Sequence, residues 1–126
     1  MKIIDKFNKN KTVYSFEVFP PKKDNDIKTI YNTLDGLKDL SPDFISVTYG
    51  AGGNIADNKT CHIAGIIKQK YGIEPLAHLT CINSEKPEVI EILSQLQDAD
   101  VSNVLALRGD KNPNLTTKTD FLYASD

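Results

Sequence analysis

The sequence is poor in several features that would point to particular classes of protein. It contains no tryptophan, one methionine and two cysteines among 126 residues, and its formal net charge is −2. Without an excess of basic residues, nothing in the composition indicates a nucleic acid or a membrane surface as a partner. The apolar runs are only a few residues long and fall far short of a bilayer span. The remaining composition, 40% hydrophobic and 25% charged, is typical of one globular domain.

The cysteines and the first residues bear on the compartment in which the protein works. Cys61 and Cys81 are isolated and lack the spacing of a metal site or a disulfide framework. The segment 1–5 lacks the long apolar stretch of a secretory signal. We therefore expect a cytoplasmic protein with two reduced thiols, no bound metal, no nucleic acid and no membrane contact.

The organising pattern is a strand followed by a helix, repeated at intervals of roughly 30 residues. Four short runs have strand character, at 13–19, 44–49, 75–81 and 103–107. Between them, apolar residues spaced three or four apart predict helices at 26–40 and 58–71 and a third after Ser84. Ser84 is the predicted N-cap of that helix, and Val89, Leu93 and Leu96 are its predicted apolar stripe. Gly72 is expected to take the positive φ that commonly follows a helix end.

Strands that alternate with helices predict a parallel sheet, which leaves two architectures. An open dinucleotide-binding sheet usually carries G-x-G-x-x-G after its first strand, whereas this strand runs into FPPK at 19–22. We therefore expect an α/β fold of the (βα)8 TIM-barrel type. A complete barrel usually needs ~250 residues, so residues 1–126 are expected to form only the N-terminal half, about four βα units, of a single catalytic domain. Open sheet edges would invite another chain, so a fragment or split gene product is expected, with self-association as a weaker alternative.

The strand alternation places polar residues on the face that would line the barrel lumen. Barrel lumens are usually filled with bulky aliphatic side chains. Here the inward positions of the first three strands are polar: Ser15, Glu17, Ser46, Thr48, His78 and Thr80. Polar groups in an enclosed space are costly unless a ligand or a network satisfies them. The pattern therefore predicts a site near the carboxyl ends of the strands.

Glu17 is the most informative single residue, and two interpretations of it stay open. It is either a strand-end carboxylate paired with a lysine or a partly desolvated carboxyl that acts as a general acid. Asp110 has the same ambiguity, because it could simply cap its own turn. His78 alone is more often a satisfied core histidine than a catalyst. No second histidine or carboxylate completes a metal site around it.

Five segments, in order along the chain, resemble the methylenetetrahydrofolate reductase family. They are SFEVFPPK at 15–22, FISVTYGAGG at 44–53, HLTC at 78–81, NVLALRGD at 103–110 and YASD at 123–126. The resemblance covers nearly the whole chain. It implies a (βα)8 barrel carrying FAD and a ping-pong reaction. NADH or NADPH would reduce the flavin, and methylenetetrahydrofolate would then be reduced to methyltetrahydrofolate for methionine synthesis.

The resemblance also implies roles for individual residues. Glu17 would be the general acid that helps to open the folate imidazolidine ring. Asp110 would lie near the flavin pyrimidine edge and the pterin, where its charge favours the cationic iminium. Thr48 would approach the reactive part of the flavin. The remaining residues expected to line FAD are Tyr49, Ala51, His78, Arg108 and Gly109, with Arg108 suited to the diphosphate.

Other interpretations of the sequence remain. The chain could be a non-catalytic truncated half-barrel or an assembly module without independent activity. Expected partners are NAD(P)H and methylenetetrahydrofolate, together with further copies of the chain in a homo-oligomer or a complementing C-terminal half. A metal-dependent aldolase-type barrel is disfavoured, because neither a ligand set nor a strand-end lysine is present.

Overall fold

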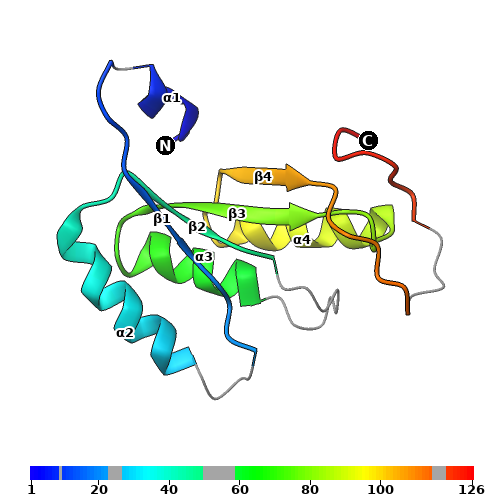
Figure 1. Cartoon of the computed structure of the whole chain (residues 1–126), viewed down its shortest axis with the longest axis horizontal. Coiled ribbons are helices and arrows are strands. Elements are labelled where there is room, and N and C mark those ends of the chain that lie inside the picture. The colour runs from blue at the N-terminus through cyan, green and yellow to red at the C-terminus, as the bar shows by residue number, and fades with distance from the viewer. Residues whose placement is uncertain (9, 23–26, 50–58, 115–118) are drawn as a thin grey trace.

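A four-stranded parallel sheet is the centre of the computed structural model, which describes residues 1–8, 10–22, 27–49, 59–114 and 119–126. The strands are β1 (Ser15–Val18), β2 (Phe44–Val47), β3 (Glu74–Thr80) and β4 (Val104–Leu107). They lie side by side in chain order, and all three neighbouring pairs are parallel (Figure 1). The four predicted strands and their parallel pairing are confirmed, although β1, β2 and β4 are shorter than expected.

Helices connect the strands as the apolar spacing predicts. A short helix, α1 (Ile4–Phe7), precedes β1, and the connecting helices are α2 (Ile27–Leu37), α3 (Lys59–Gln69) and α4 (Lys86–Asp98). A 3-10 turn, η2 (Lys38–Leu40), extends α2 to the predicted end at residue 40. Gly72 follows α3 with φ +65°, which confirms its predicted role. Within the described residues, no helix follows β4.

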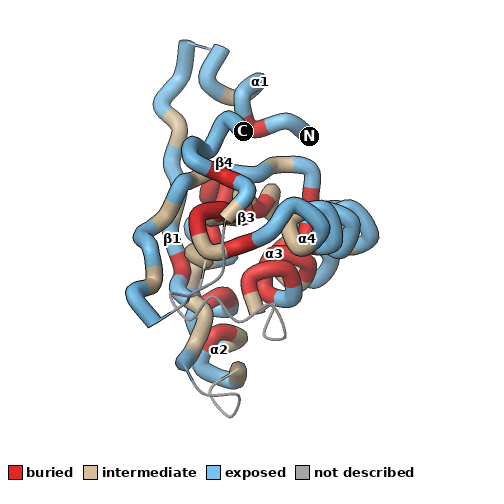
Figure 2. Tube along the Cα trace, turned by 90° about the vertical axis from the view of Figure 1, so that its right-hand side faces the viewer, coloured by how far each residue is buried: buried red, intermediate tan, exposed pale blue. Residues whose placement is uncertain are grey.

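The core lies between one face of the sheet and the connecting helices. Ile45, Val47 and Ala77 are fully buried on that face, and Ile63 and Ile67 of α3 pack against it. Figure 2 shows the buried residues concentrated around α3 and the central strands, while the outer side of α4 is exposed. Because burial of apolar surface is the main favourable term in folding, this layer stabilises the sheet.

The strand order bears on the choice between a doubly wound sheet and the barrel type that the sequence predicts. A doubly wound sheet reverses its strand order and places helices on both faces. This sheet keeps the order β1-β2-β3-β4, and its connecting helices share one hydrophobic cluster. The arrangement is an α/β fold consistent with part of a barrel. Within the described residues, β1 and β4 are open edges, so the sheet is not closed.

The start of α4 corrects two predictions. The N-cap is Glu85 rather than Ser84, and its backbone N–H donates to Glu88 Oε2 at 2.7 Å. Ser84 instead donates its backbone N–H to the carbonyl of Cys81, so it belongs to the preceding turn. The buried stripe of α4 contains Ile92 and Leu96, whereas Leu93 is 43% exposed. Each helical residue is rotated by about 100° from the one before, which turns Leu93 from the core toward the edge beside β4.

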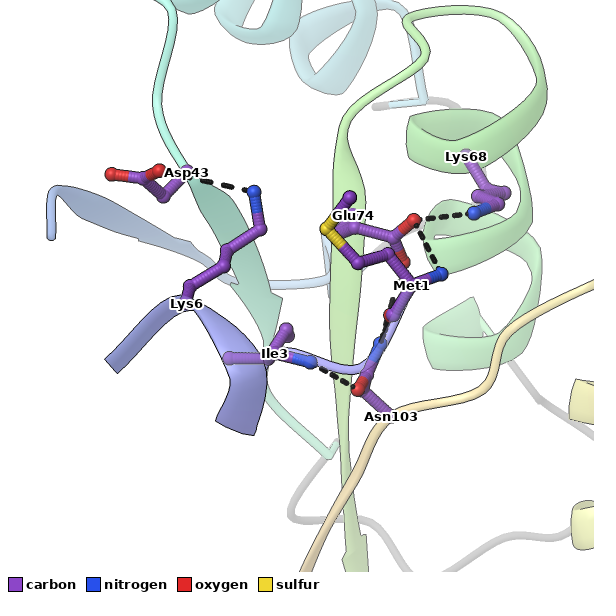
Figure 3. A network of polar contacts seen from close by, with 7 residues as sticks. All are labelled: Met1, Ile3, Lys6, Asp43, Lys68, Glu74 and Asn103. Atoms are coloured by element: carbon purple, nitrogen blue, oxygen red, sulfur yellow. Dashed lines mark hydrogen bonds and ion pairs between the residues drawn. The ribbon is translucent and has the colours of Figure 1, made fainter. Parts of the chain in front are cut away.

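The N-terminal segment is tied to the amino ends of β3 and β4 by a polar network (Figure 3). The α-amino group of Met1 lies 3.1 Å from Glu74 Oε1, and Lys68 Nζ lies 2.5 Å from the same oxygen. Asn103 accepts a hydrogen bond from the Ile3 N–H at 2.9 Å and donates to the Met1 carbonyl. Burial alone would raise the pKa of Glu74, but the hydrogen bonds and charges of Lys68 and the α-amino group hold it below its ordinary value.

Candidate active site

Three polar side chains from successive strands meet on the face of the sheet opposite the helices. Glu17 and Ser46 are register partners on β1 and β2, so their side chains point to the same side. Ser46 Oγ donates a hydrogen bond to Glu17 Oε2 at 3.1 Å. His78 Nε2 of β3 lies 3.6 Å from the same oxygen. The predicted sharing of one face by these residues is confirmed.

The three side chains differ in their access to solvent. Ser46 is only 7% exposed, and the side chain of His78 is 13% exposed. The side chain of Glu17 is 47% exposed. The described residues therefore hold the carboxyl from one side and do not enclose it. A ligand or further polypeptide covering this face would remove water from it.

The rest of this face is polar toward β1 and apolar toward β4. In the strand register Glu17 is followed by Ser46 and then by Leu76. Farther toward β4, His78 pairs with Leu105 and Thr80 with Leu107. Thr48 follows β2 and is fixed through its backbone. Its N–H donates to the Val18 carbonyl at 3.1 Å, and its carbonyl accepts from Thr60 Oγ1 at 2.9 Å.

Two of the predicted FAD contacts, Tyr49 and Ala51, follow β2 in the sequence. The ring of Tyr49 packs against the hydrophobic core. Burial raises the pKa of its phenol, with smaller contributions from Cys61 and Glu88. The ring of Tyr49 therefore lies with the core rather than on the polar face with Glu17. Ala51 lies outside the described residues.

The turn after β4 contains the other three predicted contacts. Arg108 is exposed, and its Nε donates to the Leu122 carbonyl at 3.1 Å. Gly109 has φ +77°, and a Cβ atom placed on it would lie 2.8 Å from Thr80 Cβ. Only glycine combines that φ with so close an approach. Asp110 is exposed at the end of the turn, and no contact joins it to Glu17 among the described residues.

Sequence reasoning missed Asn83, which holds this turn in place. Its side-chain Nδ2 donates to the Asp110 carbonyl at 2.8 Å, and its Oδ1 accepts from the Asn112 N–H at 2.9 Å. Asn83 thus links the loop after β3 to the loop after β4. An asparagine just after a strand, in a segment rich in turn residues, is the feature that could have indicated it.

Metal-binding clusters and membrane spans are both absent from the part of the chain that the structure describes. There, no group of three or more histidine, cysteine, aspartate or glutamate side chains could hold a metal ion. None of the helices in those residues has both the length and the apolar character needed to span a bilayer. Cys61 and Cys81 are both buried, and neither forms a disulfide within the described residues.

Comparison with known proteins places these features in a family. The family model for methylenetetrahydrofolate reductase matches residues 2–126. The 5,10-methylenetetrahydrofolate reductase of Buchnera aphidicola subsp. Baizongia pistaciae is 40% identical over 127 residues, covering 100% of this chain and 40% of the relative. The Escherichia coli enzyme of that name is 39% identical over 112 residues, covering 89% and 37%. Methylenetetrahydrofolate reductase (NADH) 1 of Arabidopsis thaliana is 36% identical over 114 residues, covering 87% and 19%. The chain thus spans less than half the length of these relatives, and it belongs to the methylenetetrahydrofolate reductase family.

Proposed function

We propose that residues 1–126 form the N-terminal half of a (βα)8-barrel catalytic domain that reduces methylenetetrahydrofolate to methyltetrahydrofolate. NAD(P)H would be the reductant and FAD the cofactor, in a ping-pong reaction. The rest of the barrel would come from a longer chain or from a complementing C-terminal half. Family membership supports this proposal, as does the consecutive parallel sheet with helices on one face.

The contact of Ser46 and His78 with the carboxyl of Glu17 is the observation that carries the proposed reaction. Both contacts reach Oε2, at 3.1 and 3.6 Å, on the face opposite the helices. A carboxyl held on one side and open on the other is placed to exchange a proton with a ligand above it. We propose that Glu17 donates a proton to a nitrogen of the folate imidazolidine ring. The ring then opens to the cationic iminium that accepts a hydride.

The side chains on this face and in the turn after β4 are of the kinds that suit FAD. Leu105 and Leu107 offer apolar surface to a flat ring system, while His78 and Thr48 offer polar groups beside it. The guanidinium of Arg108 has five N–H donors, of which Nε is engaged with the Leu122 carbonyl. Its remaining donors suit a diphosphate, and Gly109 and the backbone of Tyr49 would complete the contacts. Passing a hydride from the nicotinamide to the folate is the chemistry that FAD supplies when bound.

Asp110 is proposed to act through its charge. It follows β4 at the carboxyl end of the sheet and is exposed there, with its backbone fixed by Asn83. A carboxylate near the pterin would stabilise the positive charge that develops as the imidazolidine ring opens.

A second candidate function, a half-barrel that is inactive until it is assembled, is favoured by a groove beside β4. The groove has a volume of about 330 Å³ and is lined mainly by apolar side chains, among them Val89, Leu93 and Val104. Apolar surface next to a strand edge that is open within the described residues is suited to further polypeptide. On this proposal the isolated chain binds its complement and has no reductase activity alone.

Absorbance spectroscopy tests both candidates in one series. The chain is titrated with FAD, alone and with the C-terminal part of a bacterial relative, and the flavin spectrum is recorded. We expect bound FAD to be bleached by NADH and restored by methylenetetrahydrofolate, at least in the complemented sample. Failure to bind FAD in either sample would reject the cofactor. Bleaching without reoxidation by the folate would reject the reaction, and full activity of the chain alone would reject the assembly module.

A further inference from the structure

The hydrogen bond between Ser46 and Glu17 bears on which of the two carboxyl oxygens of Glu17 faces a ligand. We propose that Ser46 is a positioning residue, which holds Oε2 of Glu17 so that Oε1 is the oxygen presented to a ligand. The catalytic consequence of this inference rests on the function proposed above. The geometric part does not, because it concerns only two side chains that are register partners on neighbouring strands.

Ser46 is better placed for this task than His78. Its Oγ lies 3.1 Å from Oε2, whereas His78 Nε2 lies 3.6 Å away, beyond a good hydrogen bond. Ser46 is also fixed by its surroundings. It is 7% exposed and sits in β2 between Ile45 and Val47, which are both fully buried. Its hydroxyl therefore projects from one of the best-packed parts of the sheet.

A hydroxyl suits a group that must gain and lose a proton. It donates to Oε2 of the ionised carboxylate, and it still donates to Oε2 when the acid proton is on Oε1, because Oε2 is then the carbonyl oxygen of the acid. Ser46 can thus keep its hydrogen bond in both states of Glu17, whereas a cation in its place would favour the ionised state. Within the described residues, both contacts of Glu17 go to Oε2 and none to Oε1. Oε1 is consequently the oxygen left for proton transfer.

The test compares three variants, each of which changes no more than one hydroxyl and one methyl group. Ser46→Ala removes the hydroxyl, and Ser46→Thr retains it with a β-branched side chain that strands accommodate. Thr33→Ala is the control, because it deletes an exposed hydroxyl and its neighbouring methyl group on α2, where the hydroxyl donates to the Thr29 carbonyl at 2.9 Å. Amide spectra establish that each variant is folded. If Ser46→Thr does not fold, the comparison of Ser46→Ala with Thr33→Ala decides.

Two readouts keep this inference separate from the proposed function. The first is the 13C NMR resonance of the Glu17 carboxyl carbon, assigned by its loss in Glu17→Gln. We expect Ser46→Ala to shift that resonance and to make the carboxyl group of Glu17 more mobile. Ser46→Thr should show the wild-type chemical shift, and Thr33→Ala should leave the resonance unchanged. An unchanged Glu17 resonance in Ser46→Ala would overturn the inference, whatever the activity of the protein.

The second readout is the rate of each half-reaction in the complemented protein. Without Ser46, the carboxylate that forms as Glu17 gives up its proton loses a hydrogen bond, so reoxidation by methylenetetrahydrofolate should slow by about tenfold or more in Ser46→Ala. Reduction by NADH should be unchanged. Equal slowing of both half-reactions would point to a general structural defect and overturn the positioning role. If wild-type protein reduces no folate, the proposed function fails, and the carboxyl resonance alone decides the geometry.

Discussion

Gly109→Ala should destabilise the protein strongly, because two separate penalties coincide at this position. Gly109 has φ +77°, a conformation that L side chains rarely adopt. A methyl group there would also lie 2.8 Å from Thr80 Cβ and 3.1 Å from Thr80 Cγ2. Thr80 belongs to β3, which is paired on both sides, so it cannot retreat without moving the sheet.

The expected magnitude follows from adding the two penalties. The left-handed conformation costs a residue with a Cβ about 1–2 kcal/mol. Forcing a methyl group into occupied space typically costs a further 1–3 kcal/mol. We therefore expect Gly109→Ala to lower the free energy of unfolding by roughly 2–5 kcal/mol. That loss is a large part of the stability of an ordinary domain.

Two other glycines separate the penalties in the same assay, urea denaturation followed by circular dichroism. Gly72 has φ +65°, and a methyl group added there would meet no atom within 4 Å, so Gly72→Ala measures the conformational penalty alone. Gly36 lies in α2, its φ is not positive, and a methyl group added there would also meet no atom within 4 Å. Gly36→Ala should therefore raise the free energy of unfolding by up to about 1 kcal/mol. If Gly109→Ala costs no more than Gly72→Ala, the close approach to Thr80 is refuted.

Two further predictions concern the core and the N-terminal network. Ile92→Ala should lower the free energy of unfolding by about 2–5 kcal/mol, and Leu93→Ala by less than about 1 kcal/mol, because only Ile92 is buried. Equal losses in denaturation would contradict the face assigned to α4. Glu74→Gln should make stability less sensitive to acid. The pKa of Glu74 is lowered by folding, so its contribution is present above the ordinary value of 4.5 and is lost as pH falls through the lower folded value. Urea midpoints measured from pH 6 to pH 3 should therefore fall less in Glu74→Gln than in wild type, and parallel curves would contradict the pairing.

The period-two pattern of the strands predicted the polar face well, because it depends only on local geometry. Ser46 and His78 alternate with buried residues, and any parallel register that buries Ile45 and Ala77 brings them to the side of Glu17. What the pattern could not supply is the register itself, which decides that Ser46 rather than Thr48 reaches the carboxyl.

Features that depend on distant parts of the chain were not predictable. Ser84 resembles an N-cap in isolation, but the turn after β3 uses its N–H, and Glu85 takes the position. The approach of Gly109 to Thr80 depends on how β4 lies beside β3. The Met1 contact with Glu74 joins residues 73 positions apart, and no local pattern encodes it.

The central claim is that the carboxyl of Glu17 gives a proton to the folate. The most direct test is a stopped-flow comparison of Glu17→Gln with wild type in the complemented, FAD-loaded protein. We expect reduction of the flavin by NADH at the wild-type rate. Reoxidation by methylenetetrahydrofolate should be slowed by a factor on the order of 100 to 10,000, the usual contribution of general acid catalysis. Reoxidation at the wild-type rate would show that Glu17 has no part in the reaction.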